Sequence, residues 1–74
     1  MKYQIEFYED GKFLTQIGGP LDTIAEAINQ LESLKEKLGA EETENYVGIK
    51  YERNGTPCAI LVTGPFRQLI TNAS

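Results

Sequence analysis

The 74-residue chain has no histidine, no tryptophan and a single cysteine. Without histidine, neither a Ser-His-Asp triad nor a Cys-His pair can form, and the usual zinc sites lack their ligands. One cysteine cannot close an internal disulfide. The chain also contains no glycine-rich phosphate-binding motif. The sequence therefore predicts a protein that is not an enzyme, with no catalytic residue, no cofactor and no metal site.

Long apolar runs are missing as well. The longest one is Ala59–Val62, which has four residues, whereas a membrane-spanning helix needs about 20. The first residues of the chain alternate between polar and apolar, unlike a secretory signal peptide, which needs a continuous apolar stretch. We therefore expect a cytoplasmic protein that has no contact with a membrane.

Alternating apolar residues near the N-terminus predict a first β-hairpin, with strands over residues 2–8 and 12–17. A three-residue loop that ends at Gly11 would pair Phe7 with Phe13. This register keeps every large apolar side chain of the hairpin on one face, whereas a slip by one residue would expose half of them. We therefore expect the three-residue loop.

A helix is predicted over residues 23–38. Thr23 and Glu26 have the spacing of a capping box, in which each side chain satisfies a backbone N–H of the first turn. Apolar residues then recur at spacings of three and four, which places them on one stripe of a helix. Gly39 follows the last apolar residue, where a left-handed residue commonly ends a helix.

A second β-hairpin is predicted from strands over residues 46–53 and 56–63. The Asn54-Gly55 pair between them is the strongest short hairpin signal. A two-residue turn at this pair places the large apolar residues of both strands on one face. Cys58 falls on the same face, so we expect it to be a buried structural cysteine rather than a reactive thiol.

Together these elements predict an α+β fold. Two β-hairpins form a four-stranded antiparallel sheet, and one helix packs across one of its faces (ββαββ). Residues 1–64 form a single domain, and residues 65–74 form a C-terminal tail or a short helix. The expected core consists of Tyr3, Ile5, Phe7, Phe13, Ile17, Ile24, Ile28, Leu31, Leu34, Leu38, Val47, Ile49, Tyr51, Ile60 and Val62.

The order of the strands depends on Pro57. A proline cannot donate to a neighbouring strand, so it favours an edge position. We therefore expect the strand over residues 56–63 at one edge. The expected order across the sheet is 56–63, 46–53, 2–8 and 12–17.

One helix covers one face of the sheet, so the other face is open unless the C-terminal segment, with Phe66, Leu69 and Ile70, or a second subunit covers it. Alternation along the strands assigns Tyr8, Leu14, Tyr46 and Leu61 to the open face. Exposed apolar residues gathered on a sheet face are typical of interaction sites. We therefore expect a small protein-protein interaction module that docks through this face, or through an edge strand. Its partner is another protein or a second copy of the chain in a homodimer.

Nucleic acid is an alternative partner for the same face. Lys2, Lys12 and Lys50 accompany Tyr8 and Tyr46 on it, and basic residues beside aromatic ones are how some small domains bind single-stranded nucleic acid. Acidic residues interrupt this set, and the aromatic motif of RNA-recognition domains is missing. Binding to nucleic acid is therefore not the favoured function.

The acidic residues are concentrated in one segment of the chain. Residues 22–44 carry seven acidic and two basic side chains, a net charge of −5, against −4 for the whole chain. We expect Glu41, Glu42 and Glu44 to form a solvated loop. A second alternative function follows from this segment, in which a small regulatory inhibitor binds a basic protein surface through its acidic helix side.

Overall fold

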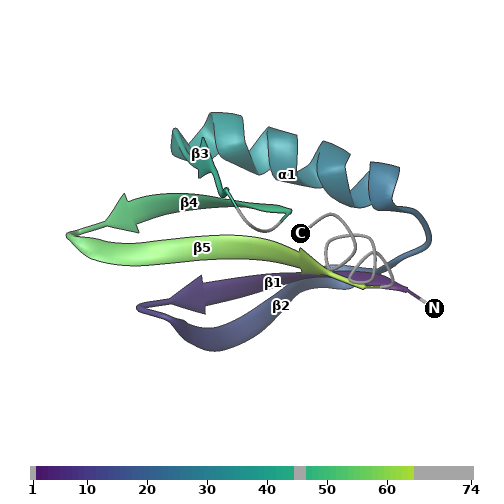
Figure 1. Ribbon diagram of the computed structural model, residues 1–74, viewed down its shortest axis with the longest axis horizontal. Helices are drawn as coiled ribbons and strands as arrows, with labels where there is room; N and C mark the ends of the chain where they lie inside the picture. The colour runs from purple at the N-terminus through teal and green to yellow at the C-terminus, as the bar shows by residue number, and fades with distance from the viewer. Residues whose placement is uncertain (1, 45–46, 65–74) are drawn as a thin grey trace.

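The computed structural model describes residues 2–44 and 47–64, which form one helix and a five-stranded antiparallel sheet (Figure 1). The elements are β1 (Tyr3–Glu9), β2 (Lys12–Leu21), α1 (Ile24–Leu38), β3 (Glu41–Glu42), β4 (Gly48–Arg53) and β5 (Thr56–Thr63). The order across the sheet is β2-β1-β5-β4-β3, and α1 lies over one face. The predicted α+β class is confirmed, with five strands instead of four. The predicted tail or short helix at 65–74 lies outside the described residues.

The first hairpin turns more tightly than predicted. Asp10 and Gly11 both have positive φ angles, 53° and 80°, and Glu9 pairs directly with Lys12. This is a two-residue turn of the kind that Asp-Gly sequences favour, because its twist matches that of the strands. The expected three-residue loop, with Phe7 opposite Phe13, is therefore wrong. Phe13 pairs with Tyr8 and leaves the predicted core.

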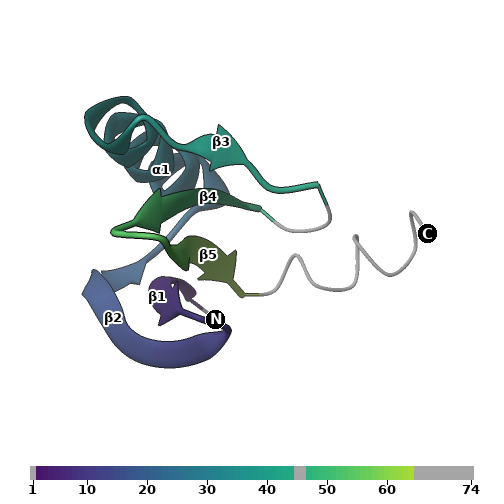
Figure 2. The same ribbon diagram turned by 90° about the vertical axis from the view of Figure 1, so that its left-hand side faces the viewer.

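Two irregularities in β2 restore the apolar pattern. Tyr8 pairs with Phe13 but Phe7 pairs with Thr15, so Leu14 is an extra residue in the strand. A second irregularity lies between the pairs Ile5–Ile17 and Tyr3–Leu21. Bulges of this kind bend a strand and increase its twist, and Figure 2 shows β2 as a wide arc that returns toward α1. The first bulge is what brings Ile17 opposite Ile5.

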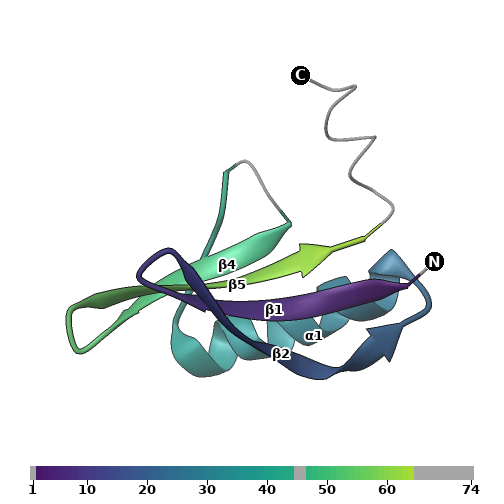
Figure 3. The same cartoon turned by 90° about the horizontal axis from the view of Figure 1, so that it is seen from below.

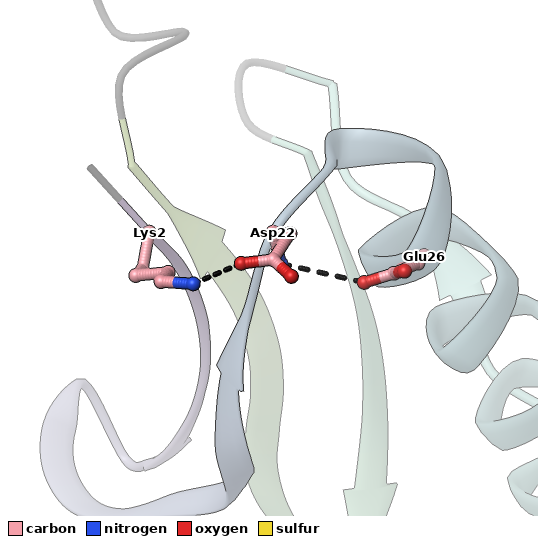
Figure 4. A network of polar contacts seen from close by, with 3 residues as sticks. All are labelled: Lys2, Asp22 and Glu26. Atoms are coloured by element: carbon pink, nitrogen blue, oxygen red, sulfur yellow. Dashed lines mark hydrogen bonds and ion pairs between the residues drawn. The ribbon is translucent and has the colours of Figure 1, made fainter.

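The start of α1 is fixed by a short network of polar contacts (Figure 4). The Thr23 hydroxyl accepts from the Glu26 backbone N–H at 3.3 Å, as the capping box predicts. The capping box predicts that the Glu26 carboxylate accepts from the backbone N–H of Thr23. It accepts instead from the backbone N–H of the preceding residue, Asp22, at 3.3 Å. Lys2 forms an ion pair with Asp22, and this hydrogen bond and charge lower the pKa of the Asp22 carboxyl.

The end of α1 also agrees with the sequence. Gly39 adopts the left-handed conformation, with φ 63° and ψ 35°. The carbonyl oxygen of Lys35 accepts from the backbone N–H of Gly39 and also from that of Ala40, at 3.0 Å, which closes the last turn of the helix. The predicted helix at 23–38 is therefore confirmed, with Thr23 as its N-cap.

The acidic stretch after α1 contains the unexpected fifth strand. Glu41 and Glu42 pair with Lys50 and Ile49 of β4. The expected solvated loop is therefore partly a short edge strand, although both glutamates stay exposed. The opposite charges of Glu41 and Lys50 favour this pairing across the strands.

The second hairpin has the predicted register. Asn54 and Gly55 form a two-residue turn with φ angles of 54° and 83°. Tyr51 pairs with Cys58, which is buried.

The predicted strand order is wrong, because β5 lies at the centre of the sheet between β1 and β4. The first β1–β5 pair is Glu9 with Cys58, so Pro57 lies just beyond the end of this ladder. Its missing N–H therefore costs no strand pairing, and its carbonyl accepts from the N–H of Asp10 at 2.8 Å. A proline at the start of a strand is compatible with a central position.

The core lies between α1 and the centre of the sheet. Its buried members are Ile5, Ala27, Leu31, Ala40, Ile49, Ile60 and Val62. Three residues of the predicted core are exposed instead, namely Phe13 on β2 and Ile28 and Leu38 on α1. Ala27, which was not predicted, is fully buried where α1 approaches the sheet. A small side chain permits this close approach.

The packing around Gly48 yields a test of the fold. A Cβ atom at Gly48 would lie 2.5 Å from Leu61 Cδ2 and 2.6 Å from the Ile60 carbonyl oxygen. We expect Gly48→Ala to lower the free energy of unfolding by about 1–3 kcal/mol, because the backbone of β5 has to move. Gly19→Ala is the matched control, since nothing lies within 4 Å of its Cβ position. Equal urea denaturation midpoints for the two variants would contradict this packing.

Candidate functional site

The open face of the sheet, opposite α1, is the candidate functional site (Figure 3). Residues paired across the strands share a face, so a row can be followed from β4 to β2. It runs through Lys50, Ala59, Tyr8 and Phe13. A neighbouring row runs through Gly48, Leu61, Glu6 and Gln16. No described element covers these two rows.

Apolar side chains occupy the β2 end of this face. The rings of Tyr8 and Phe13 meet edge to face, with centroids 5.8 Å apart and an interplanar angle of 73°. Such pairs are more favourable than their buried area alone implies. Phe13 and its neighbour Leu14, the extra residue of the bulge, are each 53% exposed. They are the most exposed large apolar side chains in the described part of the chain.

Leu61 forms the apolar centre of the face. It is half-buried, and its side chain lies over Gly48 on the neighbouring strand β4. A glycine in a strand often marks such a close approach. The Leu61 side chain therefore fills the space above Gly48, and Glu6 is the partner of Leu61 on the β1 side.

Tyr8 is held by a polar contact within the face. Its hydroxyl donates to the Glu6 carboxylate at 3.0 Å. This hydrogen bond, with smaller contributions from burial and from the charge of Glu6, raises the pKa of Tyr8 above its usual value. The contact orients the Tyr8 ring against Phe13.

The predicted interaction residues are partly brought together. Tyr8 and Leu61 lie on the open face in neighbouring rows, and Leu14 lies at its β2 edge. Tyr46 lies outside the described residues. Phe13 was missed, because the three-residue loop had assigned it to the core. The Asp-Gly pair in the turn was the signal that could have placed it correctly.

The lysines of the alternative nucleic-acid face lie apart. Lys2 is in its ion pair with Asp22 beside the start of α1. Lys12 pairs with Glu9, whose neighbour on β5 is the buried Cys58, so Lys12 lies on the helix side of the sheet. Among the three, only Lys50 shares the row with Tyr8. The described residues therefore form no continuous basic track beside the aromatic pair.

Cys58 is buried, as predicted. Its thiol lies 3.6 Å from the carbonyl oxygen of Thr56 and faces Tyr51 across the hairpin. Burial, together with the nearby Cys58, raises the pKa of Tyr51. The Tyr51 phenol therefore stays protonated at neutral pH, and the Cys58 thiol is buried rather than exposed as a nucleophile.

The two edge strands of the sheet are less suited to docking than its open face. At one edge, β3 has two residues, and both are glutamates. At the other edge, β2 is long but interrupted by two register shifts and by Gly18-Gly19-Pro20. Short edges, bulges, charges and prolines are the features that prevent strands from pairing with other chains. The described edges therefore favour docking through the face.

Metal sites and membrane spans were also searched for in the described ranges. Residues 2–44 and 47–64 contain no group of three or more Cys, Asp or Glu side chains placed to hold a metal ion. Within the same ranges, α1 is neither long nor apolar enough to cross a membrane.

The Tyr8–Glu6 contact predicts a specific titration. Because its pKa is raised, Tyr8 should remain protonated when an ordinary tyrosine ionises, near pH 10. The associated stability is present below pH 10 and is lost as the pH rises through the folded-state pKa. In Glu6→Gln the midpoint should fall toward the ordinary value, as measured by NMR of ¹³C-labelled tyrosine rings. The matched control, Glu52→Gln, should leave the titration midpoint of Tyr8 unchanged. An equal Tyr8 midpoint in Glu6→Gln and in the unchanged chain would contradict the contact.

The chain was compared with known proteins once this geometry was established. Comparison with family models, with curated proteins and with solved structures finds no match. The function is therefore argued from the geometry and charge of the described residues alone.

Proposed function

We propose that this protein is a non-catalytic interaction module that docks through its open sheet face, and that a second copy of the chain occupies this face. One observation carries the proposal. Phe13 is half exposed beside Tyr8 on a face that no described element covers, and its chain neighbour Leu14 in β2 is exposed to the same degree. Single exposed apolar residues are ordinary on protein surfaces, whereas adjacent ones on one face are typical of interaction sites.

The charge distribution favours a second copy as the partner. The two hairpins, residues 2–21 and 47–64, carry four basic and four acidic side chains, so their net charge is zero. Residues 22–44 carry −5 and lie mainly on the helix side. When two open faces meet, both acidic helices point outward, away from the contact. This arrangement avoids repulsion between like charges.

The shape of the open face suits the packing of two sheets. Facing sheets pack about 10 Å apart, with their inner side chains interdigitated. Phe13, which is 53% exposed, can insert between side chains of the other copy. A domain of this length buries a smaller share of its surface than a larger domain does, so a dimer would add a second core.

The solution mass tests this proposal. We expect a mass near twice 8.3 kDa at high concentration and dissociation on dilution, measured by light scattering on a sizing column. Phe13→Ser and Leu14→Ser should each weaken the dimer by about tenfold or more, because each removes an apolar anchor from both copies. Circular dichroism should show that both variants remain folded.

Leu38→Ser is the matched control for Leu14→Ser. Leu38 is also an exposed leucine, but it lies at the end of α1 on the other side of the sheet. It should leave the dissociation constant of the dimer unchanged. A mass of 8.3 kDa at every concentration would contradict self-association. Loss of the dimer in Leu38→Ser alone would move the interface to the helix side.

A further inference from the structure

A groove lies on the helix side of the molecule, between α1, β3 and β4, which neighbour one another in Figures 1 and 2. It holds about 220 Å³ of free space. Leu31 and Ile49 form its floor, and both are core residues. Ile28 and Val47 add apolar walls. The groove is therefore an opening of the apolar core toward the surface.

The exposure of Ile28 shows why the groove exists. Ile28 belongs to the apolar stripe of α1, yet it is 38% exposed. On the β3 side, α1 faces a strand of only two residues, Glu41–Glu42, which is too short to cover the stripe. An apolar residue that the sequence predicts in the core therefore lines an open surface instead.

Polar contacts hold the groove in shape. The Lys35 ammonium group lies 3.3 Å from a carboxylate oxygen of Glu42, which joins α1 to β3 across the groove. The backbone N–H of Thr43 donates to the carbonyl oxygen of Gly48 at 3.1 Å, which ties the end of β3 to the start of β4. A surface that is formed in advance binds with a smaller loss of entropy than one that must be ordered.

The volume limits what the groove can accept. Small-molecule and cofactor sites usually enclose about 300–1,000 Å³, so a space of 220 Å³ is small for them. A cavity of about 150 Å³ already accommodates a benzene molecule. The groove therefore has room for one large apolar side chain, such as phenylalanine or leucine.

The charge around the groove indicates the rest of the partner. Glu32 and Glu42 lie on its rim, and Glu36 is one helical turn from Glu32. Lys35, the basic residue on the rim, is already paired with Glu42. The surrounding segment, residues 22–44, carries −5. Complementary charge on a partner would therefore have to be positive.

We propose that this groove binds a basic segment of another protein, which inserts one large apolar side chain between α1 and β4 and places flanking lysines or arginines against the acidic rim. The proposal does not rest on self-association through the open face. The groove and the open face lie on opposite sides of the sheet, so a dimer formed through the open face would leave the groove accessible.

The test uses the full 74-residue chain labelled with ¹⁵N and two synthetic peptides as probes. The peptides have the sequence Lys-Arg-X-Arg-Lys, with Phe or Ala at X. Binding of the Phe peptide should shift the amide signals of Ile28, Leu31, Val47 and Ile49. The dissociation constant of the Phe peptide should be about tenfold or more lower than that of the Ala peptide, because only the Phe peptide buries an aromatic ring. Added salt should weaken both peptides.

Two charge reversals separate the groove from the rest of the surface. Glu32→Lys should lower the affinity for the Phe peptide by about fivefold or more, because the change places a positive charge on the rim of the groove. Glu52→Lys makes the same change of charge on the opposite face of the sheet, where Glu52 pairs with Pro57. It should leave the affinity within about twofold. Both residues are exposed, and the same spectra report whether each variant is folded.

Four results would overturn the proposal. The first is equal affinity of the Phe and Ala peptides, which would mean that charge alone attracts them. The second is a set of shifts centred on Tyr8, Ala59 and Leu61, which would place binding on the open face. The third is no shift with either peptide. The fourth is a concentration-dependent shift of the groove signals without peptide, which would make a second copy the occupant.

Discussion

The packing of one helix against a five-stranded sheet is the constraint on which the rest of the structure depends. A helix is about 10–12 Å wide with its side chains, whereas five strands span about 19 Å between the outermost axes. Ala27 and Leu31 of α1 meet Ile5 and Ile60 at the centre of the sheet and form the core there. α1 therefore leaves one sheet face uncovered and an open groove beside β3.

These two surfaces differ in charge, and this difference suggests different partners. The two hairpins are neutral and present the apolar pair Tyr8 and Phe13 on the open face. The helix side carries the acidic segment, residues 22–44, around a small apolar groove. A face with exposed apolar side chains can meet its own copy, whereas an acidic rim favours a basic partner. The two proposed partners would therefore occupy opposite sides of the sheet and would not compete.

The sequence predicts the local features well and the long-range ones poorly. The α1 caps and the Asn54-Gly55 turn follow from short-range chemistry, and the structure confirms both. The register of the first hairpin could not be read from the apolar pattern, because the bulge at Leu14 shifts the pattern by one residue. The central position of β5 could not be read from Pro57, because this proline lies just beyond the end of the β1–β5 ladder. The groove could not be predicted, since the stripe of α1 does not show what lies opposite Ile28.

Contact between two copies through the open face is the central claim, and isotope-filtered NMR tests it most directly. A mixture of ¹³C-labelled and unlabelled chains gives cross-peaks only between different copies. We expect such cross-peaks between the methyl groups of Leu14 and Leu61 and the rings of Tyr8 and Phe13. Their absence at a concentration where the chain is dimeric, or cross-peaks from the methyl group of Leu38 instead, would contradict the account.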